Sequence, residues 1–219
     1  MKRLLWAAGL VLALAAPQLA RAETACADLK TTALPHAEVT AAVSEVSGST
    51  TLCKLSVTSR PTPTSDIRIE VWIPVGTAWN GKFVQLGNGG FAGSIASGRL
   101  KAMAATGYAT AGTDNGHQAA GTSASWALGY PEKIVDFGYR SLKETVDISK
   151  ALIRAQKSGG PQTSYFFGCS DGGREALMMA QRFPADFDGI VAGAPANYMS
   201  RLFGIGTANQ QALAKPGGY

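Results

Sequence analysis

Residues 168–172 have the sequence Gly-Cys-Ser-Asp-Gly and stand between a run typical of a β-strand and a run typical of an α-helix. The aromatic residues of 164–167 predict the strand, and 174–182 predict the helix. Glycines on both sides of Ser170 lack a Cβ atom and permit a strained strand-to-helix turn. Such a turn raises the serine hydroxyl above the sheet and directs the free N–H groups of the new helix toward it. Ser170 is therefore a candidate nucleophile; the alternative is a glycine-rich turn whose serine has no chemical role.

The rest of the chain passes from strand patterns to strand–helix alternation. In 67–74 every second residue is apolar, which predicts an antiparallel, half-buried strand. Residues 121–137 have no clear period and predict a structured surface loop. Other predicted elements are extended structure in 37–59, strands at 83–86, 108–111 and 190–192, and helices at 97–106 and 139–156. This order indicates a mostly parallel sheet with antiparallel N-terminal strands. Together with the strand-to-helix turn at Ser170, it favours an α/β-hydrolase fold with helices on both faces of the sheet.

The N-terminus has the features of a signal peptide. Met1-Lys2-Arg3 is basic, 4–17 is apolar, and Ala20-Arg21-Ala22 has the small-x-small pattern of a cleavage site. We predict a signal peptide over 1–22, a mature chain that begins at Glu23, and a secreted or periplasmic protein; the alternative is an N-terminal core helix. The apolar run is too short to span a bilayer comfortably, and no second long apolar segment follows, so no membrane span is expected in the mature chain.

The charge of the chain does not favour a nucleic-acid partner. The formal net charge is +5, but three basic residues and no acidic ones precede Glu23, so 17 basic and 15 acidic side chains remain after it. The remaining Lys and Arg residues are scattered and form no basic run. A protein that binds nucleic acid needs a concentrated basic surface, and the sequence offers none.

Export permits disulfides, and the chain has three cysteines. Cys26 and Cys53 lie near the predicted mature N-terminus and could close a loop, which would stabilise the fold by about 3–4 kcal/mol. Cys169 would then have no partner within the chain. An odd thiol in an exported protein requires an explanation.

A serine nucleophile also needs donors for the oxyanion of the tetrahedral intermediate. The backbone N–H of Asp171, the residue after Ser170, is the first candidate. The second comes from the glycine-rich run 86–91 that follows the strand at 83–86, and there we predict Gly90, with Gly89 as the alternative donor. The alternative is that this run forms an ordinary tight turn without a catalytic function.

The general base is missing from the expected place. In this fold the order along the chain is Ser, then Asp or Glu, then His, but the two histidines, His36 and His117, both precede Ser170. His117 follows a predicted strand and could border the site. Chain order argues against it as the base and favours a structural role with hydrogen bonds near its loop.

Several blocks of the sequence closely resemble the tannase/feruloyl esterase family, which also contains hydrolases of mono(2-hydroxyethyl) terephthalate. The clearest is 167–176, followed by 181–184 and 187–196. Further similar blocks, in the order of the family, are 79–83, 87–93, 107–108 and 113–117. The resemblance covers roughly residues 26–215, so 23–219 is identified as the N-terminal part of an α/β-hydrolase catalytic domain.

The resemblance implies hydrolysis of esters of aromatic acids such as gallate or ferulate through an acyl-enzyme on Ser170. It also implies that Cys169 pairs with a cysteine next to the catalytic histidine, beyond Tyr219. In the family a lid that often binds calcium, then the catalytic acid and histidine, follow the region seen here. No metal site and no cofactor are therefore expected within this chain, and the only small molecule expected is an aromatic ester.

Two other interpretations remain open. One is that the 219 residues, as less than half of a family member, are a catalytically inactive fragment with poor solubility, because unpaired sheet edges would be exposed. The other is a serine peptidase or acyltransferase on the same fold, which the family blocks disfavour.

Overall fold

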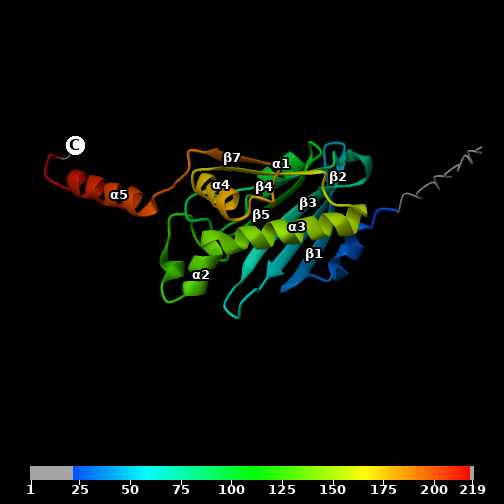
Figure 1. The fold of residues 1–219 in the computed structure, drawn as a ribbon, viewed down its shortest axis with the longest axis horizontal. Helices are drawn as coiled ribbons and strands as arrows, with labels where there is room; N and C mark the ends of the chain where they lie inside the picture. The colour runs from blue at the N-terminus through cyan, green and yellow to red at the C-terminus, as the bar shows by residue number, and fades with distance from the viewer. Residues whose placement is uncertain (1–21, 218–219) are drawn as a thin grey trace, which may run out of the picture.

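The computed structural model describes residues 22–217, so the predicted signal peptide lies outside the described residues except for Ala22. Seven strands form one sheet in the order β1-β2-β3-β5-β4-β6-β7 (Figure 1). The strands are β1 (Ala37–Ser47), β2 (Thr50–Ser59), β3 (Ile67–Pro74), β4 (Lys82–Leu86), β5 (Ala109–Thr113), β6 (Thr163–Cys169) and β7 (Gly189–Gly193). The α-helices are α1 (Ser97–Ala104), α2 (Pro131–Val135), α3 (Ser141–Lys157), α4 (Asp171–Arg182) and α5 (Met199–Leu213). Short 3-10 helices are η1 (Cys26–Thr31), η2 (Gly76–Ala78) and η3 (Ser125–Ala127), and η4 (Asp136–Arg140) is a π-helix.

The sheet is mixed, and its two ends differ in strand direction. The strands β1, β2, β3 and β5 pair antiparallel in that order, whereas β5, β4, β6 and β7 pair parallel. The predicted antiparallel N-terminal strands are confirmed. Within residues 22–217 the pairings divide evenly between the two directions, so the sheet there is mixed and the prediction of a mostly parallel sheet is wrong for these residues. Below, β1–β3 are called the antiparallel half and β4–β7 the parallel half.

The extended structure predicted for 37–59 is two strands joined by a tight turn. Ser47 pairs with Thr50, and Gly48 takes the left-handed backbone that such a two-residue hairpin needs, with φ 61°. The Gly-Ser pair is itself a hairpin signal that the sequence analysis did not use.

Helices cover both faces of the sheet, as predicted. α3 and α4 pack on one face, over a core that includes Phe83, Leu142 and Phe166. α1 packs on the other face, where Trp72 and Leu100 belong to a smaller core. α3 and α4 therefore cover one face of the parallel half, whereas α1 covers β3 and β5 on the other face, where Phe167 and Val191 remain exposed (Figure 1). Because β4–β7 run parallel, their carboxyl ends lie at one edge of the sheet.

The prediction that 67–74 is half-buried is wrong. Of the residues of β3 only Arg68 is exposed, because α1 covers the second face of the strand. The buried Glu70 carboxylate accepts hydrogen bonds from Trp72 Nε1 at 2.6 Å and from Ser97 Oγ at 2.9 Å. The polar residues at alternate positions indicated solvent contact, which holds for Arg68 alone. Glu70 lies beneath α1, where its carboxylate also pairs with Lys54.

The disulfide considered between Cys26 and Cys53 is present and joins η1 to β2, with 5.4 Å between the two Cα atoms. Cys169, at the end of β6, is exposed and has no disulfide partner among residues 22–217. The disulfide thus belongs to the antiparallel half, and the free thiol stands beside Ser170.

The predicted surface loop 121–137 is partly helical, so this prediction is wrong over its second half. The short helix α2 begins with proline at its first position and continues through η4 into α3. A π-helix inserts an extra residue into the helical register. That insertion hides the 3.6-residue period on which the sequence prediction depended, and it also places the start of α3 at Ser141 instead of Tyr139.

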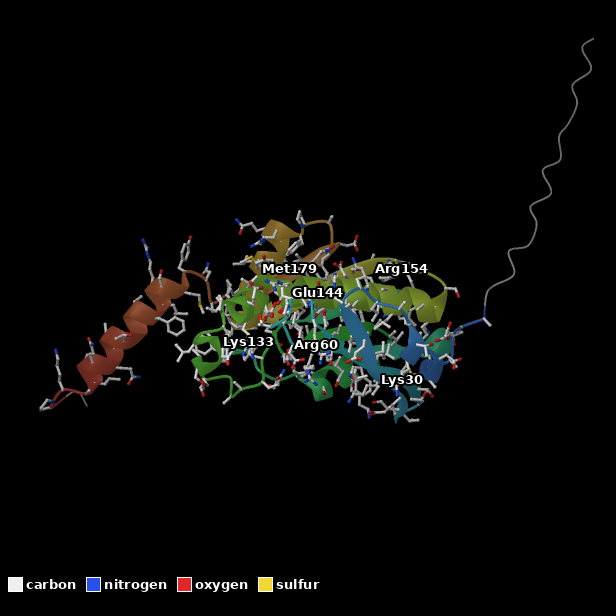
Figure 2. The ribbon with its side chains drawn as sticks, turned by 90° about the horizontal axis from the view of Figure 1, so that it is seen from below. Lys30, Arg60, Lys133, Glu144, Arg154 and Met179 are labelled. Atoms are coloured by element: carbon white, nitrogen blue, oxygen red, sulfur yellow. A yellow bond between two sulfur atoms is a disulfide. The ribbon has the colours of Figure 1, made fainter. Side chains whose placement is uncertain are left out.

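The last helix, α5, extends away from the sheet and its helical layers (Figure 1). Its residues are exposed except for the half-buried Met199, and only its first turns approach the rest of the domain (Figure 2). Among the described residues, no helix combines the length and the apolar character needed to cross a bilayer.

Candidate active site

Ser170 lies between the last residue of β6 and the first residue of α4, in a strained backbone conformation with φ 62° and ψ −117°. Such a conformation costs about 1–3 kcal/mol for a residue other than glycine. The surroundings hold it in place: the Ser170 N–H donates to the carbonyl of Gly193 at 3.0 Å, and the Ser170 carbonyl accepts from Ala196 N–H at 3.0 Å. The side chain is exposed at the open edge of the sheet. The predicted strand-to-helix turn is therefore present, although α4 begins three residues earlier than the sequence indicated.

Three glycines around this turn are required by close packing. A Cβ atom on Gly168 would overlap the carbonyl oxygen of Gly172, and one on Gly173 would overlap that of Gly193. A Cβ on Gly172 would lie 2.9 Å from the carbonyl oxygen of Asn88. Glycine is needed at these three positions because the backbone at the ends of β4, β6 and β7 packs directly against the start of α4.

Two residues that line the space near Ser170 have a backbone N–H without an acceptor among the described residues. Within residues 22–217 neither Asp171 N–H nor Gly90 N–H has an acceptor, whereas Phe91 N–H donates to the carbonyl of Gly121 at 2.7 Å. Gly90, Ser170 and Asp171 line one hollow, and Gly89 does not line it. Gly90 has φ 60°, and a Cβ there would overlap the Gly121 carbonyl oxygen. The structure brings the three predicted site residues together at one hollow.

The hollow beside Ser170 measures about 360 Å³ and is mostly apolar. Besides the three residues above, its walls are Phe91, Gly121, Thr122, Ala196, Met199, Leu202 and Phe203. The rings of Phe91 and Phe203 stack with their centroids 5.6 Å apart, so α5 contributes one side of the hollow. A flat aromatic group would find complementary surfaces there.

The Asp171 side chain is committed to an ion pair. Its carboxylate accepts from Arg174 Nε at 2.6 Å, and Arg174 lies over the Phe137 ring and donates to the carbonyls of Phe137 and Gly138. The pair therefore anchors η4 to α4. Asp171 contributes its backbone N–H to the hollow and keeps its charge turned toward Arg174.

Neither histidine is arranged as a base for Ser170. His117 is buried; its Nε2 lies 2.7 Å from the carbonyl oxygen of Phe91, and its Nδ1 lies 3.4 Å from that of Asn115. Its ring stacks on Trp126 at 3.8 Å between centroids, and burial lowers the pKa of the imidazole. His36 precedes β1, five strands from β6, a distance of about 24 Å at the usual strand spacing. His117 is thus held by hydrogen bonds near its own loop, as the order of residues along the chain predicted.

A buried carboxylate near the turn was missed by the sequence analysis. Glu175, one turn into α4, is fully buried and accepts from Asn88 N–H at 2.9 Å and from Asn115 Nδ2 at 2.5 Å. Burial, together with the negative charge of Asp171, raises the pKa of Glu175 to about 7. The available signal was helical spacing, since Glu175 shares the buried face of α4 with Ala176 and Met179.

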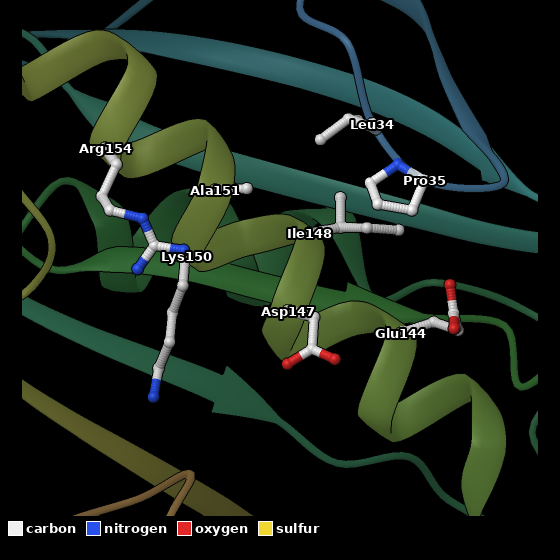
Figure 3. A pocket seen from close by; sticks show the side chains of 8 residues that line it. All are labelled: Leu34, Pro35, Glu144, Asp147, Ile148, Lys150, Ala151 and Arg154. Carbon is white, nitrogen blue, oxygen red and sulfur yellow. The ribbon is translucent and has the colours of Figure 1, made fainter.

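Other hollows do not adjoin Ser170. One of about 450 Å³ lies between α3 and the segment that leads into β1, and charged side chains of α3 border it (Figure 3). It shares no lining residue with the hollow at Ser170. In the part of the chain that the structure describes, no three His, Cys, Asp or Glu side chains gather as metal ligands.

Comparison with known proteins identifies the family of this chain. The family model for tannase and feruloyl esterase matches residues 53–216. The chain belongs to this family. It is 43% identical to an uncharacterized esterase of Xanthomonas campestris pv. campestris, over 81% of this chain and 33% of the relative. It is 40% identical to a probable feruloyl esterase B-2 of Neosartorya fischeri, over 74% of this chain and 30% of the relative.

Among solved structures, feruloyl esterase B from Aspergillus oryzae superposes with a TM-score of 0.75 at 31% identity, covering 84% of this chain and 39% of that one. The predicted α/β-hydrolase fold is confirmed by this likeness. The chain spans about a third of the length of these members of the tannase and feruloyl esterase family.

Proposed function

We propose that this chain carries the nucleophile and the oxyanion donors of a carboxylic ester hydrolase that acts on esters of phenolic acids. The observation that supports this most directly is the strained Ser170 turn, with Asp171 N–H and Gly90 N–H free beside it in one hollow. Membership of the tannase and feruloyl esterase family supports the same activity.

In the proposed reaction, Ser170 Oγ attacks the ester carbonyl carbon as a base removes its proton. The carbonyl oxygen becomes an oxyanion that accepts from Asp171 N–H and Gly90 N–H, and removal of one such donor typically costs about 10²–10³ in kcat. The alcohol leaves with a proton, and water then releases the acid from the acyl-enzyme. Because both nitrogens of His117 face carbonyl oxygens, we propose that the base and its acid belong to a part of the whole protein outside these residues.

The walls of the hollow support an aromatic acyl group. Phe91, Met199 and Phe203 offer apolar and aromatic surface within reach of Ser170, and the lining includes no basic side chain. A neutral phenolic ring suits this surface better than a second carboxylate would, since a buried unpaired charge is costly. We propose phenolic esters such as ferulates and gallates as the substrate class, with no cofactor in this part of the protein.

Export of the protein is part of the same proposal. The Cys26–Cys53 disulfide is typical of an oxidising compartment and supports the signal peptide predicted over 1–22. Cys169, exposed beside the nucleophile, is then available for the disulfide to a cysteine near the catalytic histidine that the family resemblance implies. We propose a secreted or periplasmic location.

The test is hydrolysis of ethyl ferulate and methyl gallate by the complete gene product and by its Ser170→Ala variant. We expect turnover by the wild type, a loss of at least about 10³-fold in the variant, and labelling of Ser170 by a fluorophosphonate in the wild type alone. Unchanged turnover by the variant would refute the proposal. Faster cleavage of feruloyl amides than of the esters would favour a peptidase instead.

The same assay on the 219-residue chain tests the source of the base. We expect this chain to show no triad-dependent turnover. Turnover by it that a His117→Ala change abolishes would show that His117 acts as the base after all.

A further inference from the structure

The carboxylate of Glu175 connects the helix that follows Ser170 to the loop that carries Gly90. Its Oε2 accepts from the backbone N–H of Asn88 at 2.9 Å, and the side chain has no exposed surface. A Cβ atom on Gly87 would lie 2.7 Å from the same Oε2. The loop therefore passes directly over the carboxylate, one turn of α4 after the candidate nucleophile.

Asn88 is held from three directions. Besides donating to Glu175, it accepts from Gly172 N–H at 2.8 Å through its carbonyl and donates from Nδ2 to the carbonyl of Thr113 at 2.9 Å. Two of these partners belong to α4. Asn88 precedes the Gly89-Gly90 pair, so its position determines where the Gly90 N–H lies relative to Ser170.

The second oxygen of the carboxylate is fixed by a chain of hydrogen bonds from the other side. Asn115 Nδ2 donates to Glu175 Oε1 at 2.5 Å, Ser141 Oγ donates to Asn115 Oδ1 at 3.0 Å, and the same hydroxyl lies 2.8 Å from the carbonyl oxygen of Asp136. Asn115 itself has φ 61°. The loops after β4 and β5 and the start of α3 thus meet at one buried side chain of α4.

We propose that Glu175 is a positioning residue for the oxyanion hole: through Asn88 it holds the Gly90 N–H against the turn of Ser170. This inference rests on the proposed function, in which Gly90 and Ser170 act on the same carbonyl group. Glu175 does not touch the substrate. Its effect is on the placement of a donor, and small errors in placement near a reacting group reduce rates by about 100-fold.

The role needs an oxygen acceptor and does not need a negative charge. A glutamine at 175 can accept from Asn88 N–H with its oxygen and donate from its nitrogen to Asn115 if the Asn115 amide turns over. The turned amide then donates to Ser141 Oγ, whose single hydrogen turns to the carbonyl oxygen of Asp136. A leucine of similar size offers no acceptor and leaves Asn88 N–H unpaired.

The test compares Glu175→Leu with Glu175→Gln in the complete gene product, with Gln156→Leu as a matched control. Gln156 is equally buried, at the far end of α3, so its change is of the same kind at a distance from the site. We measure kcat and KM for ethyl ferulate per folded molecule, and inhibition by the trifluoromethyl ketone analogue of ferulate, whose Ser170 adduct places an oxyanion between the two donors.

We expect E175L to lower kcat about 100-fold with KM changed less than threefold, and to weaken the ketone inhibitor by a similar factor. E175Q should stay within about fivefold of the wild type in both, and Q156L should change neither. A merely structural role would lower the folded fraction without changing kcat per folded molecule or the inhibitor constant.

An unchanged kcat in folded E175L, or an equal loss in E175L and E175Q, would overturn the inference. If E175L does not fold, E175A is measured in its place; failure of both to fold would assign Glu175 to folding and also overturn it. The S170A variant separates this inference from the proposed function: if S170A retains full turnover, the proposed function fails, whatever Glu175 does.

Discussion

The antiparallel half and the parallel half of the sheet contribute to the same two hydrophobic cores but differ in where the backbone is strained. β1, β2 and β3 pair in continuous register except for one bulge near Thr40, and their connecting hairpin places a glycine where φ is positive. In the antiparallel half one non-glycine residue with positive φ, His36, precedes β1, whereas in the parallel half such residues follow each strand after its carboxyl end: Ala92, Asn115, Ser170, Ala194 and Tyr198. The charged groups differ as well, since Asp114 and Glu175, the two carboxyls with strongly raised pKa, both belong to the parallel half.

This difference indicates that the antiparallel half mainly stabilises the domain, whereas the parallel half forms the candidate active site at Ser170. The antiparallel half has regular hydrogen bonding and a disulfide, and it has no residue in the hollow at Ser170. The parallel half has the close backbone approaches, strained residues and buried charges that an active site requires, and each of these reduces stability. Ligands of open α/β sheets bind at the carboxyl ends of the strands, where these features gather.

The largest expected effect is on the free energy of unfolding, and it should differ between a glycine of the parallel half and one of the antiparallel half. Gly168→Ala places a Cβ atom onto the carbonyl oxygen of Gly172, so we expect a loss of more than about 4 kcal/mol in the free energy of unfolding. Gly48→Ala in the hairpin meets no atom within 4 Å, and we expect only about 1–2 kcal/mol from its positive φ. Urea unfolding of both variants measures the difference. Equal losses would show that the glycines near Ser170 are no more constrained than a turn glycine.

The second expected effect lies in the antiparallel half. The double change Cys26→Ser and Cys53→Ser opens a link between residues 27 positions apart, and we expect a loss of about 3–4 kcal/mol. The folded molecule should keep its turn at Ser170, because no atom of the disulfide touches it. Urea unfolding gives the stability, and fluorophosphonate labelling of the complete gene product serves as the control. Loss of labelling in folded protein would contradict the separation of the two halves.

The third expected effect is a pH dependence that originates in the parallel half. Burial and the charge of Asp171 raise the pKa of Glu175 from an ordinary 4.5 to about 7, so between these values the folded chain binds a proton that the unfolded chain has released. The free energy of unfolding should therefore fall as the pH rises through this window, by about 3 kcal/mol. Glu175→Gln should remove this part of the fall.

Thermal unfolding from pH 4.5 to pH 7.5 checks this prediction. Burial also raises the pKa of Asp114, to about 6, so a smaller fall in stability in the same direction should persist in the variant at lower pH. Identical pH profiles for wild type and Glu175→Gln would mean that the buried carboxyl does not titrate in this range.

The smallest expected effect concerns two exposed valines on the outermost strands. Val191 of β7 is 55% exposed and lines an apolar hollow of about 480 Å³ together with Tyr165 and Phe167, whereas Val46 of β1 is 66% exposed and does not line that hollow. Lysine at either position should change the unfolding free energy of the 219-residue chain by less than about 0.5 kcal/mol. Only Val191→Lys should reduce self-association, as measured by sedimentation over a range of concentrations. An equal effect of Val46→Lys would remove the distinction between the two edges.

The sequence was informative where a local pattern has a single physical solution. The glycines around Ser170, an aromatic run before them and a helical run after them predicted the turn, and the alternation in 67–74 predicted a strand. The sequence also allowed the Cys26–Cys53 disulfide to be considered, because the two cysteines lie in the same short N-terminal region. Short-range sterics and periodicity are enough for such features.

Other features depended on contacts between distant segments. The burial of Glu70 under α1, the π-helix that displaces the start of α3, and the enclosure of His117 between Trp126 and the Phe91 carbonyl could not be derived from neighbours in the sequence. The same holds for Glu175, whose partners lie 87 and 60 residues away.

The sequence by itself thus determined the type of turn, its serine and the family of the chain. Only the tertiary structure decided which N–H groups near that serine are free, which histidine is already engaged, and which carboxylate supports the loop of Gly90. The physical reason is that hydrogen-bond satisfaction and desolvation depend on what surrounds a group in space.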